Sequence, residues 1–217
     1  MREDSTGSPE SQAGRKAASM ATLSEDASLA LPLRLIAAAW FGLTALMLTL
    51  VMLVLAAGNS TTPPTINFIL FFCETPAALA AAFGFLLGGR IIDPEAEYSS
   101  THAVLRGILI ALLSLITFVC LYIAAAYVDA KQAGAKQWVL DNMVSVLLIG
   151  CLMMALPVSL PGALAGWTLF RWSGGRRRDW LRSFPADGPG AAGLWNLVAL
   201  LLVGVNCVIA VKLLRLD

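Results

Sequence analysis

Five long apolar runs, almost without charged residues, constrain this chain more than any other feature of its sequence. They lie at Leu35–Ala57, Ile66–Gly88, Val104–Val128, Val139–Phe170 and Ala192–Leu214. A helix needs about 20 apolar residues to cross the hydrocarbon of a bilayer, and each run is long enough. Only 13% of the 217 residues are charged, against about 25% in soluble domains. The sequence therefore predicts an all-α, polytopic membrane helix bundle of five transmembrane helices.

The segments outside these runs are polar, and their basic residues are unevenly divided. Residues 1–29 are rich in Ser, Ala, Gly and acids. Such a segment cannot bury enough apolar surface to fold, so we expect a disordered cytoplasmic tail before a transmembrane domain at 30–217. With the N-terminus inside, eleven of the 15 Lys and Arg residues fall in inner segments. Because positive charge stays on the cytoplasmic side, we expect a multi-pass protein of the plasma (inner) membrane with its C-terminus extracytoplasmic.

Prolines interrupt the second and fourth runs. Pro76 lies in the second, and Pro157 and Pro161 lie in the fourth. As one straight helix the fourth run would reach about 48 Å, which exceeds the roughly 30 Å of hydrocarbon. A proline removes a helical hydrogen bond and crowds the preceding turn. We therefore predict kinks at all three prolines, with a kink or break near Leu156–Pro161.

The inner halves of the same two runs resemble each other. "PAALAAAFGFLLGGRIID" begins at Pro76 and "PGALAGWTLFRWSGGRRRD" begins at Pro161. With one gap, both share a proline, an Ala-Leu-Ala motif, a phenylalanine and a Gly-Gly-Arg-x-x-Asp ending. One interpretation is a pair of helical hairpins related by an axis along the membrane normal. The alternative is that each Gly-Gly ends a helix through a left-handed glycine, while the arginine meets the inner headgroups.

Glu74 is the one acid deep within a predicted span. The small residues at helical spacing from it are Ala77, Ala78, Ala81, Gly84 and Gly88. Small residues mark helix–helix contacts in bilayers, whereas bulky ones suit lipid, so we expect Glu74 to point into the bundle. Gly162 and Gly166 form a Gly-x-x-x-Gly pair, which predicts a second close helix contact.

Two roles remain open for Glu74. As a structural clamp, it would form a hydrogen bond with the Phe72 carbonyl left by Pro76, or with Asn206 at similar depth in the fifth run. As a functional group, it would relay a proton or cation, or contact a substrate. No basic residue lies deep in a span to complete a relay, so we favour the clamp.

A basic and aromatic segment follows the fourth run. Its members are Arg171, Trp172, Arg176, Arg177, Arg178, Trp180 and Arg182. Arginines interleaved with aromatic rings can bind nucleic acid or a phosphate ligand. Here they lie directly beside a membrane span, where tryptophan and arginine meet anionic headgroups. We therefore predict anchoring to membrane lipid and no nucleic-acid partner.

Residues for enzyme chemistry are sparse. His102 is the only histidine, so we expect a solvated loop residue and no metal site. Four cysteines lie in four different runs: Cys73, Cys120, Cys151 and Cys207. A redox pair is conceivable, but cysteine also serves as a small apolar residue in packed bundles. No motif of a catalytic or cofactor site is present, so we expect no enzyme activity and no cofactor.

These features predict an integral membrane protein that acts as a non-enzymatic structural or accessory subunit. It would work through helix–helix contacts with other membrane protein subunits or with itself as a homo-oligomer. The alternative is a small proton-linked transporter or channel built on Glu74 and a broken fourth helix.

Overall fold

Helices make up almost all of the chain that a computed structural model describes, and no strand occurs in that part. The described residues are 31–58, 65–92, 99–132, 134, 137–174, 179–181, 183 and 191–214. The main helices are α2 (Leu31–Gly58), α3 (Ile66–Phe83), α4 (Ser100–Gln132), α5 (Gln137–Ser173) and α7 (Ala191–Leu214). The predicted all-α class is therefore confirmed for these residues, and the predicted tail at 1–29 lies outside them.

Four helical segments are long and apolar enough to cross a membrane. They are Leu31–Leu55, Ile69–Ile91, Ser100–Gln132 and Leu148–Ser173. The corresponding apolar stretch of α7, Gly193–Ile209, is shorter. An all-helical fold with four helices long and apolar enough to cross a membrane is thus confirmed in the described part of the chain. The fifth span stays a prediction.

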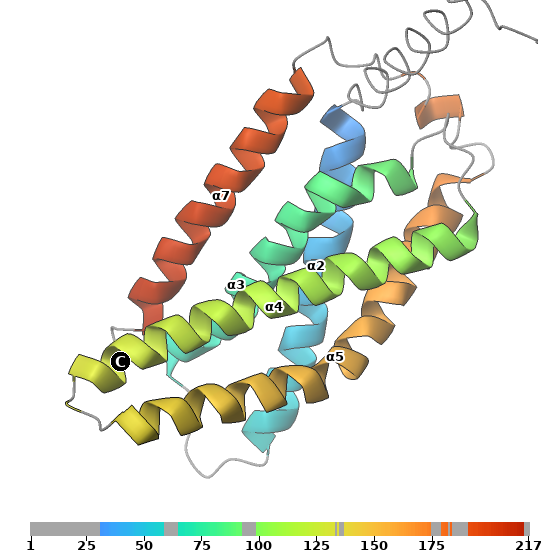
Figure 1. Cartoon of the computed structure of the whole chain (residues 1–217). Coiled ribbons are helices and arrows are strands. Elements are labelled where there is room, and N and C mark those ends of the chain that lie inside the picture. The colour runs from blue at the N-terminus through green and yellow to red at the C-terminus, as the bar shows by residue number, and fades with distance from the viewer. Residues whose placement is uncertain are drawn as a thin grey trace, which may run out of the picture.

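Consecutive helices run in opposite directions and form two hairpins (Figure 1). The hairpin of α2 with α3 lies against the hairpin of α4 with α5, and α7 packs mainly on α3. This arrangement places the starts of α2, α4 and α7 at one end of the bundle, with the ends of α3 and α5.

The helices that contain prolines are continuous. Pro76 lies inside α3, and Pro157 and Pro161 lie inside α5, which is continuous from Gln137 to Ser173. The predicted break in the fourth run is therefore not confirmed. Figure 1 shows that α5 changes direction part-way along its length. Since a straight helix looks straight from every side, α5 is bent, as expected of a helix that holds proline.

The C-terminal end of α3 departs from α-helical geometry. A π-helical turn η1 (Gly84–Gly88) and a 3₁₀ turn η2 (Gly89–Ile91) follow it. Gly88 has φ −77° and Gly89 has φ −55°, so both are right-handed. The prediction that this pair ends the helix through a left-handed glycine is wrong. A Cβ on Gly84 or on Gly88 would lie 3.0 Å from atoms of α2, which shows that the glycines serve packing instead.

Glycine also permits the closest helix contact in the bundle. Gly107 of α4 lies over Gly162 and Gly166 of α5, and a Cβ on Gly107 would come within 3.0 Å of the Gly166 Cα. A Cβ there would also overlap the carbonyl oxygen of Gly162. The backbones of α4 and α5 are therefore in direct contact, as small residues allow in membranes.

We expect Gly107→Ala to destabilise the protein by about 1–3 kcal/mol, because the added methyl group forces two tightly packed backbones apart. Gly150→Ala is the matched control, since a Cβ on this α5 glycine meets nothing within 4 Å. The control should be neutral, or stabilising by up to about 1 kcal/mol, through helix propensity. Thermal unfolding in detergent measures both, and equal effects would contradict the tight contact.

Candidate functional site

Glu74 lies on the exposed surface of α3, and the expectation that it points into the bundle is wrong. The most deeply buried side chains of α3 are those of Phe71, Thr75 and Leu79, at 0%, 1% and 0% exposure, which form one stripe at helical spacing. Phe71 packs against Phe118 of α4, with ring centroids 5.2 Å apart. The bulky face of α3 therefore meets another helix rather than lipid, and this turns Glu74 outward.

The small residues of α3 do pack, but against α2. A Cβ on Gly42 of α2 would lie 3.0 Å from the Ala81 Cβ and 3.3 Å from the Ala77 carbonyl oxygen. Gly84 and Gly88 are buried against the same helix. The predicted small face is thus a helix contact that stops one turn short of Glu74.

No hydrogen bond or ion pair holds Glu74 within the described part of the chain. The expected bonds to the Phe72 carbonyl and to Asn206 are not formed. A carboxyl group inside an apolar span is costly when it has no partner. Glu74 is therefore a carboxyl group within a candidate span that has no compensating partner among the described residues.

Asn206 lines a cavity of about 520 Å³ among α2, α3 and α7. Its Oδ1 is buried and has no hydrogen-bond partner among the described residues. Ala78, one turn after Glu74, lines the same cavity. Glu74 itself does not line this cavity, and no bond joins it to Asn206.

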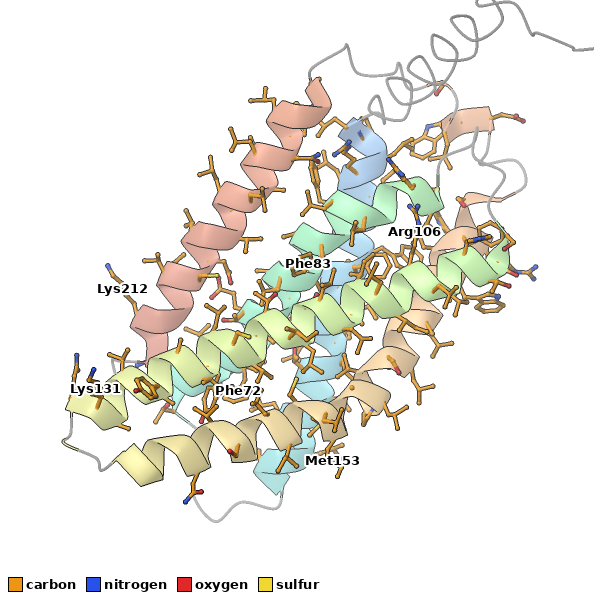
Figure 2. All side chains as sticks on the ribbon, viewed as in Figure 1. Phe72, Phe83, Arg106, Lys131, Met153 and Lys212 are labelled. Atoms are coloured by element: carbon orange, nitrogen blue, oxygen red, sulfur yellow. The ribbon has the colours of Figure 1, made fainter. Side chains whose placement is uncertain are left out.

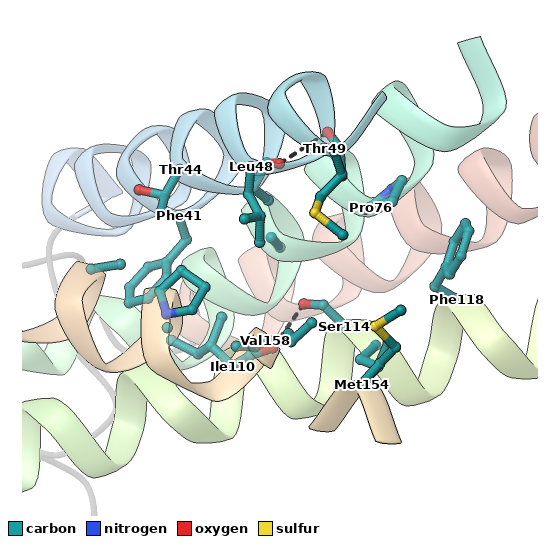
Figure 3. Close-up of a pocket in the computed structure, with 18 of the residues that line it drawn as sticks. Phe41, Thr44, Leu48, Thr49, Pro76, Ile110, Ser114, Phe118, Met154 and Val158 are labelled. Carbon is teal, nitrogen blue, oxygen red and sulfur yellow. Dashed lines mark hydrogen bonds between the residues drawn. The ribbon is translucent and has the colours of Figure 1, made fainter. Parts of the chain in front are cut away.

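A second cavity of about 210 Å³ lies among α2, α3, α4 and α5 (Figure 3). Pro76 and Pro161 line it from opposite hairpins, and Ser114 is its buried polar residue. None of the residues lining either cavity is ionisable. Both cavities are therefore suited to apolar groups rather than to ions.

Three basic side chains lie towards the ends of the bundle. In Figure 2, Lys131 and Lys212 are at one end, while Arg106 is near the other. Arg106 Nη1 donates a hydrogen bond to the Leu87 carbonyl oxygen at 3.4 Å, within the π-helical turn. This contact satisfies a backbone group at the irregular end of α3 and ties α4 to it.

Arg34 joins three helices at the same end, which the sequence did not indicate. It is only 7% exposed, and its Nη1 donates to Asn196 Oδ1 of α7 at 2.7 Å. Its guanidinium lies 5.7 Å from the centre of the Phe85 ring. A lone arginine at the start of a span resembles an interfacial anchor, so nothing in the sequence pattern revealed this long-range bond.

Three tryptophan rings contact one another in succession. Trp40 Nε1 donates to Thr168 Oγ1 at 3.3 Å, and the Trp40 ring lies 5.9 Å from that of Trp172. Trp180 lies a further 6.5 Å along, and Leu181 is buried. The predicted anchoring residues Arg176, Arg177, Arg178 and Arg182 lie outside the described residues. Trp172 and Trp180 thus take part in packing, where only lipid contact was predicted.

The remaining candidates show no clustering. Cys73 is buried, Cys120 is exposed, and Cys151 and Cys207 are half-buried; all four are free. His102 is exposed and its Nδ1 lies 2.8 Å from Ser99 Oγ at the start of α4. Within the described ranges, no three His, Cys, Asp or Glu residues are grouped to hold a metal ion.

Comparisons of the chain with protein families, characterised proteins and solved structures found no match.

We expect Asn206→Leu to stabilise the isolated chain, because it removes a buried amide oxygen that lacks a partner. Leaving such a group unsatisfied costs about 1–3 kcal/mol. Asn142→Leu is the matched control, since Asn142 is exposed on α5 and its replacement relieves no burial. Thermal unfolding in detergent compares the two, and destabilisation by Asn206→Leu would show that this amide contributes to the fold.

Proposed function

We propose that this chain is a non-enzymatic accessory subunit of the membrane that binds a partner membrane protein through the surface around Glu74. The exposed position of Glu74 inside a candidate span carries this proposal. The partner would present a hydrogen-bond donor or a basic side chain at the same depth.

The free-energy cost of placing the Glu74 carboxyl group in a bilayer without a partner supports this function. Glu74 lies eight residues after the start of α3, which is about 12 Å along the helix. An acid near the centre of a span costs about 2.5–3.5 kcal/mol on insertion scales. A partner that forms a hydrogen bond with the carboxyl group offsets part of this cost. The chain alone is therefore less favourable in the bilayer than its complex.

The topology proposed with this function has five spans in the plasma membrane, with the N-terminus inside and the C-terminus outside. The 24 residues of α7 extend about 36 Å, enough to cross the hydrocarbon. Arg90 and Arg106 lie at the end where α2 starts, while Lys131 and Lys212 lie at the other. Arginine at the inner end agrees with the positive-inside rule.

The transporter alternative has less support. Neither cavity is lined by Glu74 or by any other ionisable residue. A proton or ion path through a membrane protein requires polar groups that face the interior or water. The exposed position of Glu74 favours association instead.

We expect Glu74→Leu to abolish binding of the partner while leaving the isolated chain folded, because Glu74 lies on the surface. Glu74→Gln keeps hydrogen bonding and should retain part of the binding, since such interhelical bonds contribute about 0.6–2 kcal/mol. The measurement is the amount of partner that co-purifies in mild detergent, with thermal unfolding of each variant as the folding control. A Glu74→Leu variant that keeps its partner would refute the proposed surface. A folded Glu74→Gln variant that loses pH-dependent transport would favour the transporter instead.

A second experiment tests the topology. We expect a reporter fused after Pro185 to be cytoplasmic and one fused after Asp217 to be extracytoplasmic, because α7 lies between them. The measurement is the activity of a reporter that works only outside the cytoplasm. Equal activity of the two fusions would mean that α7 does not cross the membrane.

A further inference from the structure

The two hairpins pack through corresponding residues. Gly107 of α4 meets Gly162 and Gly166, while Gly42 of α2 meets the residues that the repeat aligns with them in α3. These are Ala77 and Ala81, one and five positions after the first proline of the repeat, as Gly162 and Gly166 follow the second. The sequence repeat is therefore matched by a repeated helix contact.

The correspondence continues into the cavity between the hairpins. Seven residues after the contact glycines, α2 has Thr49 and α4 has Ser114, and both line this cavity. Thr49 Oγ1 donates to the Ala45 carbonyl oxygen at 3.0 Å, and Ser114 Oγ donates to that of Ile110 at 2.7 Å. The two hydroxyl groups make equivalent bonds four residues back along their own helices (Figure 3).

The second helix of each hairpin contributes matching residues as well. Pro76 and Pro161 line the cavity, and so do Ala80 and Ala165, four residues further on. The cavity thus lies where the two repeats meet. In transporters built from repeats, substrate sites lie at such interfaces near the middle of the bilayer, which shows that a repeat interface can hold a ligand.

The chemistry of the lining selects an apolar ligand. The hydroxyl hydrogens of Thr49 and Ser114 are already donated to their own helices, and no lining residue is ionisable. The volume of about 210 Å³ is larger than the roughly 150 Å³ of an apolar cavity that stays dry and binds benzene. Hydrocarbon can enter this space without leaving a polar group unsatisfied.

The mouth of the cavity opens between α2 and α5. Met52 of α2 and Met154 of α5 both line the cavity and are also 50% and 47% exposed. Figure 3 shows Met154 beside the cavity. Both helices are candidate spans, so the surroundings of this mouth are lipid chains. Methionine is flexible and adapts to varied apolar ligands, which suits an entrance.

The side chain of Arg171 on α5 places a positive charge within reach of a lipid whose acyl chain enters the cavity through this mouth. Arg171 is exposed, and its guanidinium lies 5.7 Å from the centre of the Trp167 ring. It follows Val158 of the cavity lining by thirteen residues, or about 20 Å, comparable with the roughly 15 Å of one leaflet's hydrocarbon. Leu160 and Leu164, both exposed, share the face of α5 that carries Arg171. A headgroup phosphate near Arg171 would complement its charge.

We propose that the cavity between the hairpins binds one acyl chain of an anionic phospholipid whose headgroup lies against Arg171. The site is separate from the surface around Glu74, so the two proposals stand independently. The acyl chain would fill the space left where the two repeats meet.

The test uses the full chain purified in detergent and supplied with phosphatidylglycerol or phosphatidylcholine, each with a photoreactive group at the end of one acyl chain. We expect cross-links to concentrate on the mouth and lining residues of α2 and α5, as mapped by mass spectrometry of peptides. Cross-links spread evenly over the exposed apolar surface would overturn the proposal.

Two substitutions sharpen the result. Ala45→Phe fills the cavity and should remove these cross-links, while Ala124→Phe, at an exposed position of α4, should not. If Ala45→Phe does not fold, the smaller Ala45→Leu takes its place. Cross-linking that persists in a folded filled variant would overturn the proposal.

Arg171→Gln should keep the cross-links but lower the preference for phosphatidylglycerol over phosphatidylcholine about fivefold, the effect of one basic group near such a headgroup. The preference is measured from lipid adducts in native mass spectrometry, with each variant's thermal unfolding as the folding control. An unchanged preference would overturn the assignment of the headgroup to Arg171.

Discussion

Direct backbone contact between helices is the interaction on which this bundle depends. Lipid chains are as apolar as leucine, so the hydrophobic effect does not hold helices together within a bilayer, and close packing must do so. Dispersion forces between atoms fall away steeply when a gap opens. Gly107 on Gly162 and Gly42 on Ala77 bring the backbones of each hairpin to this range. The cavity lies where the two hairpins that these contacts hold together meet.

Polar side chains form different kinds of hydrogen bond at the end of the bundle and in its middle. At the end where α2 starts, Arg34, Trp40 and Arg106 bond across helices. In the middle, the hydroxyl of Ser114 bonds within its own helix, which leaves apolar walls around the cavity. Glu74 breaks this pattern because it is both intramembrane and exposed. That exception, rather than any constellation of catalytic residues, favours a role in association.

The sequence predicted the membrane class well and the orientation of Glu74 badly. Long apolar runs identify spans because hydrocarbon leaves few alternatives to a helix. The small residues of α3 were correctly read as a helix contact, but Glu74 was assigned to the same buried face. The error came from assuming that the bulky face of this helix meets lipid, whereas Leu79 on that face is fully buried in the bundle. The buried Arg34–Asn196 bond was missed because its partners are 162 residues apart.

The sequence by itself determined that this chain forms apolar helices long enough to span a membrane, since backbone groups within hydrocarbon must bond to one another. It also showed the repeat that begins at Pro76 and Pro161. Helix pairs of similar sequence can pack alike, so the repeat indicated similar helix contacts. Only the tertiary structure decided which face of each helix is covered and where the cavity lies. The physical reason is that these features depend on the shapes of side chains from helices distant in sequence, which meet only after the bundle has packed.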